Sequence, residues 1–358
     1  MMFNRLPTNL FARIAFMHLA AGTAEAHHSF TAHYDSRETV EITGVVVNYR
    51  IVSPHSSITV DVTNENGSVD QWTVETNSAN AVRRRGWDEN TFKPGDVITV
   101  SGFPHRTSRL QMHGTEFLTA HGMAPARQSA EELVAAYPPD PSERGFTGRW
   151  VPQRRGASGP QGSPLPLTAA GLQAWEDYDS ARSPVTTCEP MNIPTLFYAS
   201  YLLDIHMDDQ YVTLDHELYD ITRRVPLNAE PESQHESGLF GVASARLRGN
   251  ELVIESFGYP PSKWGLAVAV LRNGNGADIP SSAQKKMTER YTVSEDGSKL
   301  RLEYTLQDPV YLTEPFFHDG EWTRIAADAP IIFDYACNPD SAALFTGSSE
   351  SDQSAGRP

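Results

Sequence analysis

The chain has 358 residues, which exceeds the usual size of one domain, so we expect two domains. Its formal net charge of −16 argues against nucleic acid or anionic lipid as a partner, because both are recognised by basic surfaces. After residue 26 no segment is long and apolar enough to cross a bilayer, so we expect no transmembrane segment once a signal peptide is removed.

Residues 1–26 have the pattern of a secretory signal peptide. Arg5 and Arg13 supply the basic start, a short apolar run follows, and Ala24-Glu25-Ala26 has the small-x-small pattern of a cleavage site. We therefore expect a periplasmic or secreted protein whose mature chain begins at His27.

Residues 27–122 predict a small β-domain. An Asn66-Gly67 pair between two strand-like runs indicates a hairpin. The expected strands are Val40–Val47, Ser57–Val62, Asp70–Glu75, Val97–Gly102 and Glu116–Ala120, with a helix over Ser78–Arg85. Five strands with a helix between the third and the fourth are typical of an OB-fold, a small Greek-key barrel.

The remaining chain divides into three parts. Residues 123–144 predict a short helix and a linker, because Tyr137-Pro138-Pro139-Asp140-Pro141 cannot continue a helix. Residues 145–340 contain eight or more short runs of alternating polar and apolar residues, which favour a larger, lipocalin-like antiparallel β-barrel. Residues 341–358 are rich in Ser, Gly and Asp and predict a disordered tail.

Five short motifs of the first domain occur in the order seen in a known family. They are His27-His28-Ser29-Phe30, Ser53-Pro54-His55-Ser56, Gln71-Trp72-Thr73-Val74-Glu75, Arg84-Arg85-Gly86-Trp87 and Lys93-Pro94-Gly95-Asp96. Over about residues 27–121 the sequence therefore resembles an uncharacterised family of secreted bacterial proteins. This family is defined only as a domain of unknown function. Ser53 is a departure, since the family usually has Asn there.

The second half is similar to another uncharacterised exported β-rich domain. The similarity depends on Gly148-Arg149-Trp150, Thr222-Arg223-Arg224, the Arg248–Ile254 segment and Leu306-Gln307-Asp308-Pro309. These resemblances imply a compartment and a fold, and no activity.

Four histidines form a candidate metal site: His27, His28, His33 and His55. An N-terminal histidine binds a metal through its amine and its imidazole, and one further imidazole would complete a three-nitrogen site suited to copper. Zinc also accepts neutral imidazoles. The alternative is that His27 and His28 are solvent-exposed residues at the start of the chain and that His55 only stabilises its loop.

In the second domain, a candidate ligand site comprises His216, Arg223, Arg224 and Trp264. His216 lies on the apolar face of its predicted strand, and an arginine inside a barrel can hold a carboxylate. The alternatives are a core histidine and a surface arginine pair.

Cys188 and Cys337 are the two cysteines, and in an oxidising compartment an isolated pair favours a disulfide over a redox or metal site. The alternative is two buried thiols.

The sequence favours an exported protein that binds a small apolar or carboxylated molecule, with a metal, copper or zinc, at the mature N-terminus. The motifs GxSxG, HExxH, GxGxxG and Walker A are missing, so no catalytic residue can be named. Two alternatives stay open: an enzyme that uses a metal or an acid/base pair, and an envelope scaffold that binds another protein.

Overall fold

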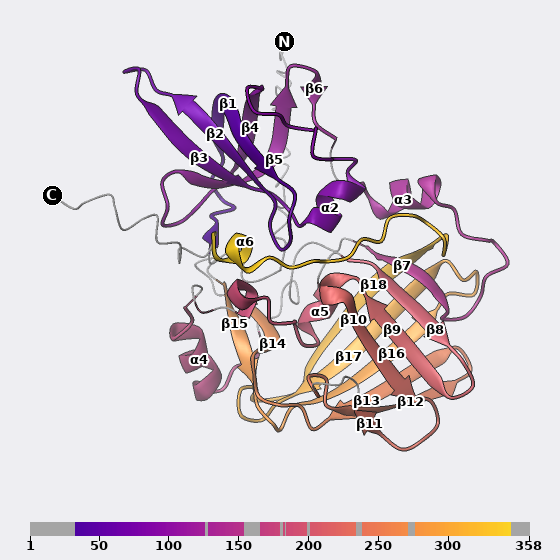
Figure 1. Ribbon diagram of the computed structural model, residues 1–358. Coiled ribbons are helices and arrows are strands. Elements are labelled where there is room, and N and C mark those ends of the chain that lie inside the picture. The colour runs from indigo at the N-terminus through magenta and orange to yellow at the C-terminus, as the bar shows by residue number, and fades with distance from the viewer. Residues whose placement is uncertain are drawn as a thin grey trace, which may run out of the picture.

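The computed structural model describes residues 33–125, 128–153, 165–179, 182, 184–198, 201–233, 238–270 and 276–344. Two β-barrels, joined by short helices, account for most of these residues (Figure 1). The chain is mainly β, as the sequence predicts.

The first barrel is a closed five-stranded barrel. Its strands are β1 (Val40–Arg50), β2 (Ser57–Thr63), β3 (Val69–Glu75), β4 (Val97–Pro104) and β5 (Gln111–Thr119), followed by a two-residue strand β6 (Gly122–Met123). The sheet order is β3-β2-β1-β4-β5-β6, and a parallel pairing of β3 with β5 closes the barrel. This is the OB-like arrangement expected from the sequence.

One short helix, α2 (Ala79–Arg84), connects β3 to β4. The side chain of Ser78 accepts a hydrogen bond from the backbone N–H of Ala81 and caps the helix start. Gly86 follows the helix at φ +86°, a conformation that glycine adopts without steric cost. The helix end is thus placed where the sequence indicates.

The second barrel is larger and nearly closed. The strands of its sheet follow the order β10-β9-β8-β7-β18-β17-β16-β13-β12-β11. They are β7 (Gly148–Pro152), β8 (Leu203–Met207), β9 (Tyr211–His216), β10 (Ile221–Pro226), β11 (Glu232–Ser233), β12 (Val242–Arg248), β13 (Glu251–Phe257), β16 (Lys286–Val293), β17 (Lys299–Gln307) and β18 (Phe316–Ile325). Leu227, after β10, forms a bridge to Ala245 of β12 and brings the two ends of the sheet together.

A separate hairpin and several short helices complete the second half. They are β14 (Ser262–Val270) with β15 (Gly276–Ser281), α3 (Ala130–Ala136), α4 (Ala169–Glu176), the 3-10 turns at Pro184–Thr187 and Leu218–Asp220, α5 (Thr195–Tyr198) and α6 (Pro339–Leu344). Among the described residues, no helix has the length and apolar composition needed to cross a membrane.

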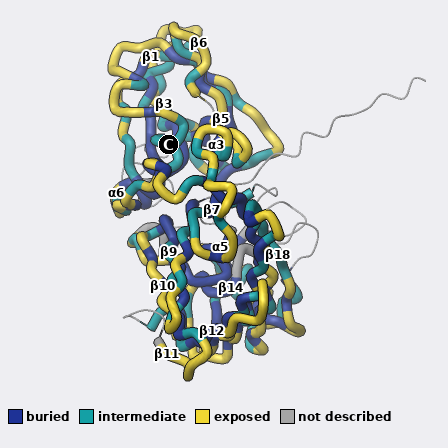
Figure 2. The backbone as a smooth tube through the Cα atoms, turned by 90° about the vertical axis from the view of Figure 1, so that its right-hand side faces the viewer, coloured by how far each residue is buried: buried dark blue, intermediate teal, exposed yellow. Residues whose placement is uncertain are grey.

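Alternating side chains fill both barrels, and Figure 2 shows the buried residues gathered inside each of them. In β17, for example, Leu300, Leu302 and Tyr304 face inward and Arg301 and Glu303 face outward. Each barrel has its own hydrophobic cluster.

The C-terminal segment runs between the two barrels and ends in α6 beneath the first (Figure 1, yellow). A disulfide joins its Cys337 to Cys188, which confirms the predicted bridge. The predicted disordered tail begins at residue 341, but Ser341–Leu344 complete α6, and Ser341 and Ala342 are buried. Tertiary contacts order these residues although their composition favours disorder; residues 345–358 lie outside the described residues.

Candidate functional site

One end of the first barrel gathers six polar or aromatic side chains, which we call the histidine cluster. Its members are His33, Tyr34, His55, Glu75, His105 and His113, and all six are buried. They come from the segment before β1, the β1–β2 loop, the end of β3, the residue that follows β4 and the start of β5.

Glu75 lies at the centre of the histidine cluster and is 2% exposed. Nδ1 of His55 is 2.6 Å from its Oε1, and Nδ1 of His113 is 3.7 Å from the same oxygen. The Tyr34 hydroxyl donates a hydrogen bond to Oε2. One buried carboxylate therefore orients three side chains.

Strand register explains why these residues meet. Glu75 pairs with Ser57 across the antiparallel β2–β3 ladder, which places it beside the loop that carries His55. It also pairs with His113 across the parallel β3–β5 ladder that closes the barrel. The barrel closure thus brings together residues that no local pattern connects.

The segment before β1 is attached to the same end of the barrel. The backbone N–H of Arg106 donates to the carbonyl of His33 at 2.7 Å, and the backbone N–H of Asp35 donates to the carbonyl of Pro104 at 3.1 Å. The guanidinium of Arg106 also lies 3.0 Å from Asp35. These contacts hold the His33 ring 5.9 Å from the ring of His105, measured between centroids.

Hydrogen bonds determine which ring nitrogens carry lone pairs. Nδ1 of His105 accepts from the backbone N–H groups of Thr107 and Ser108, so the proton of the neutral ring is on Nε2 and His105 has no free lone pair for a metal. Nδ1 of His55 instead donates to Glu75, the contact by which a carboxylate orients the ring in a carboxylate–histidine–metal arrangement.

Burial and charge act on the pKa values of the cluster. Burial lowers the pKa of His33 to about 4, against the attraction of Glu75, so its imidazole is neutral at pH 7. Burial alone would raise the pKa of Glu75, but the adjacent His55 and His113 outweigh it, and the pKa lies well below its ordinary value. The cluster therefore combines the carboxylate of Glu75 with the neutral imidazole of His33.

The structure tests only part of the predicted metal site. His33 and His55 lie in the same cluster, whereas His27 and His28 fall outside the described residues. Within the described ranges no three His, Cys, Asp or Glu side chains converge closely enough to hold a metal ion on their own. A metal in this cluster would need donors from elsewhere in the chain.

The four residues of the predicted ligand site do not all face the same way. His216, Arg223 and Trp264 are buried in the second barrel, while Arg224 is exposed and stacks on the ring of Tyr211. Arg223 and Arg224 are consecutive in β10, so their side chains point to opposite faces of the sheet.

Arg223 forms a two-bonded ion pair with Glu289, at 2.8 and 3.1 Å, and both side chains are fully buried. The Tyr291 hydroxyl donates to the same carboxylate at 2.7 Å. Nearby, the ammonium of Lys285 donates to the carbonyl of Gly265 at 2.6 Å and lies 4.3 Å from the ring of Tyr259. These polar groups pair with other groups of the protein and occupy the barrel interior.

His216 lines a small pocket near one end of the second barrel, with Phe197 and Trp322 among its other walls. The pocket has a volume of about 10 Å³, which admits one water molecule and no larger ligand. Burial lowers the pKa of His216 to about 3. A second pocket, of about 50 Å³, lies between the barrels beside Arg84 and Leu202 and has room for a few waters.

Four members of the histidine cluster are absent from the predicted site: Tyr34, Glu75, His105 and His113. Glu75 stands at the end of a predicted strand, where a barrel-closing parallel pair would place it opposite β5. Glu75 could have been identified by applying the OB topology to the predicted strands.

The fold and the site together define a two-barrel β protein with a buried histidine cluster in its first barrel. Residues 16–115 match a family of unknown function, DUF6152. The match confirms the predicted similarity of the first domain to an uncharacterised family. No curated protein matches the chain.

Proposed function

We propose that the protein is an exported metal-binding protein that holds a copper or zinc ion at the histidine cluster, with donors supplied by the mature N-terminus. The observation that carries this proposal is the grouping of four buried histidines in one cluster with Glu75, at the barrel end where the N-terminal segment is attached.

The N-terminal donors are within reach of the cluster. His28 precedes His33 by five residues, which span at most ~18 Å when fully extended. Because His33 is attached beside His105, we propose that the amine and imidazole of His27 join the cluster in holding the metal. An amine and two imidazoles form a three-nitrogen donor set that copper(II) accepts well.

The small-molecule alternative in the second barrel has less support. Its interior is occupied by the ion pair of Arg223 with Glu289, and the pocket at His216 has the size of a water molecule. We therefore place the binding function in the first barrel.

The first experiment determines the mature N-terminus, by mass spectrometry of protein exported to the periplasm. We expect a chain that begins with His27. Any other first residue would remove the amine of His27 from the donor set, and a retained chain in the cytoplasm would contradict export.

The second experiment measures copper and zinc binding by isothermal titration calorimetry on the mature protein. We expect His27→Ala and His55→Ala each to weaken binding more than tenfold, because each removes a nitrogen ligand. The control is His121→Ala, since His121 is exposed on the β5–β6 turn outside the cluster. Wild-type affinity in both test variants would contradict the proposal.

A further inference from the structure

The partly enclosed pocket between the two barrels, which we call the interbarrel pocket, has a volume of about 50 Å³. Helix α2 of the first barrel lines one side of it, and α3, β7 and Leu202 line the other. The two sides differ in chemistry, because the first is basic and the second is apolar.

Two arginines give the α2 side of the interbarrel pocket its positive charge. Glu217 balances the charge of Arg84, whereas Arg85 donates to the neutral amide oxygen of Asn77. Among the described residues that line the pocket, none is acidic. Glu132, in the first turn of α3, is exposed, so water screens its charge. The pocket therefore favours an anion.

The guanidinium of Arg84 is held along one edge only. Its Nη1 donates to Glu217 at 2.5 Å and to the carbonyl of Ile331 at 3.3 Å, and its Cζ lies 5.9 Å from the centre of the Tyr201 ring. The Arg84 side chain is 10% exposed. Its hydrogen bonds to described residues all use Nη1, so Nε and Nη2 are available to a ligand. These two nitrogens form the side-on edge of a guanidinium, which matches the two oxygens of a carboxylate.

The opposite wall of the interbarrel pocket is apolar. Leu133 of α3, Val151 of β7 and Leu202 line it, and all three belong to one hydrophobic cluster of buried residues. Hydrocarbon against this wall would leave water, which favours binding. The ligand that fits both sides has a carboxylate at one end and a short alkyl group at the other.

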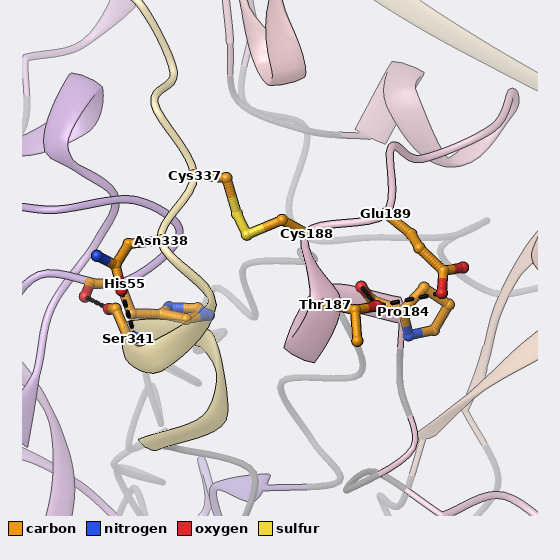
Figure 3. Close-up of a disulfide and its surroundings, with 8 residues drawn as sticks. All are labelled: His55, Pro184, Thr187, Cys188, Glu189, Cys337, Asn338 and Ser341. Atoms are coloured by element: carbon orange, nitrogen blue, oxygen red, sulfur yellow. Dashed lines mark hydrogen bonds between the residues drawn. A yellow bond between two sulfur atoms is a disulfide. The ribbon is translucent and has the colours of Figure 1, made fainter. Parts of the chain in front are cut away.

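The C-terminal segment holds the two sides of the interbarrel pocket together. The disulfide connects Cys337 of this segment to Cys188, with the two Cα atoms 5.9 Å apart (Figure 3). The next residue reaches the first barrel, where the backbone N–H of Asn338 donates to the carbonyl of Ser53 at 2.7 Å. The pocket is therefore preformed, and a ligand has no need to bring the barrels together.

We propose that the interbarrel pocket binds a small monocarboxylate of the size of acetate or propionate. The carboxylate bonds to Nε and Nη2 of Arg84, and the alkyl end contacts Leu133 and Leu202. A volume of about 50 Å³ has room for a few water-sized groups, which suits a carboxylate with one or two further carbons. This site is separate from the histidine cluster, and it does not depend on the proposed metal.

The first measurement is a titration of the mature, deuterated full chain with sodium propionate, followed by NMR shifts of the backbone amides. Sodium chloride keeps the ionic strength constant, and no metal is added. We expect saturable shifts at residues 81–85, 130–133 and 202. The dissociation constant should be weaker than ~10 μM, because so few ligand atoms make contact. A wild type without saturable shifts at these residues overturns the proposal.

Two variants test the location of the site. Arg84→Lys keeps a positive charge opposite Glu217 but removes the two-nitrogen edge, and it should weaken propionate binding at least tenfold. Ala81→Leu fills the pocket without changing any charge, and it should abolish the shifts. The matched control is Arg83→Lys on the same helix, since Arg83 contacts the exposed Glu89, and it should bind as wild type does.

A series of anions tests the class of ligand. Nitrate and formate have no alkyl group to cover the apolar wall, so both should bind more weakly than propionate. Pivalate should not bind, because its branched alkyl group exceeds the volume of the pocket. Equal affinity for nitrate and propionate would overturn the assignment, since the pocket would then select charge alone.

The variants keep this inference falsifiable. Wild-type affinity in Ala81→Leu overturns it, because propionate would then bind elsewhere. If Arg84→Lys fails to fold, Ala81→Leu decides the question, since it leaves the ion pair of Arg84 with Glu217 intact. A failure to bind propionate leaves the proposed metal binding untouched, and a failure to bind copper leaves this proposal untouched.

Discussion

Arg84 on α2 and the buried Glu217 after β9 form a partly buried ion pair between the two barrels, with Nη1 2.5 Å from Oε1. The same carboxylate accepts hydrogen bonds from the amide of Asn80 at 3.1 Å and from the backbone N–H of Leu202 at 3.1 Å. One carboxylate of the second barrel therefore satisfies donors of both barrels.

Breaking this pair should destabilise the protein strongly. We expect Glu217→Ala to lower the free energy of unfolding by about 3–5 kcal/mol, because it leaves the Arg84 charge unpaired in a buried contact. Urea denaturation followed by circular dichroism measures the change. The matched control is Glu89→Ala, which removes the exposed partner of Arg83 and should cost less than about 1 kcal/mol. Equal effects of the two variants would contradict this role for Glu217.

Substitutions of Arg223 and Glu289, which form an ion pair inside the second barrel, should have non-additive effects on the free energy of unfolding. Each single change, Arg223→Met or Glu289→Leu, leaves one buried charge without its partner and should cost about 3–5 kcal/mol of unfolding free energy. The double variant should recover most of that loss, since two apolar side chains of similar volume remove both charges. A double-mutant cycle in urea measures the coupling, and additive losses would show that the pair does not act as a unit.

Stability should fall as the pH is lowered from about 6.5 towards 3. His33 has a folded pKa of about 4 and His216 one of about 3, both below the unfolded value of 6.5. Between these values the unfolded chain binds more protons, so the free energy of unfolding falls with decreasing pH, by up to about 1.4 kcal/mol per pH unit for each histidine. The contribution is fully present above pH 6.5.

The variant His216→Leu tests whether this pH dependence of stability comes from the buried histidines. It removes one of the two buried histidines and should flatten the pH dependence of unfolding measured between pH 6.5 and 4. The exposed His121 provides the control, and His121→Ala should keep the wild-type slope. A His216→Leu slope equal to that of wild type would show that His216 does not contribute.

Glu75→Gln should weaken copper binding about 10- to 100-fold, because the amide no longer supplies the negative charge that orients the His55 ring. Titration of the metal into the mature variant measures the loss. The control is Glu116→Gln, a change at an exposed position of β5 outside the cluster. Unchanged affinity in Glu75→Gln would mean that this carboxylate has a structural role only.

Much of the first barrel could be predicted from the sequence. Local signals mark its elements: alternation in β1, the Asn66-Gly67 turn between β2 and β3, and the Gly86 that ends α2. The start of β5 is different, since that strand begins at Gln111 and not at Glu116. Residues 111–114 include Gly114 and a buried His113, so they lack strand alternation, and the pairings with β3 and β4 are what make them a strand.

The candidate site was predictable only in part. His55 could be selected because a histidine in the loop between the first two strands of an OB-like barrel lies near a known ligand-binding region. Glu75 and His113 could be selected only by applying the OB topology to the predicted strands, because each is unremarkable within its own strand. Their meeting depends on a parallel pairing between residues far apart in the chain.

The sequence by itself determined the β class of both domains and the cysteine pair, because these depend on residue alternation and on the chemistry of single residue types. Only the tertiary structure decided that His33 and His55 share a buried cluster around Glu75, and that Arg223 pairs with Glu289. It also placed Ser341 against His55, although the composition of that segment favours disorder. Such contacts arise from barrel closure and from the return of the chain between the barrels, which long-range packing decides and local sequence patterns do not encode.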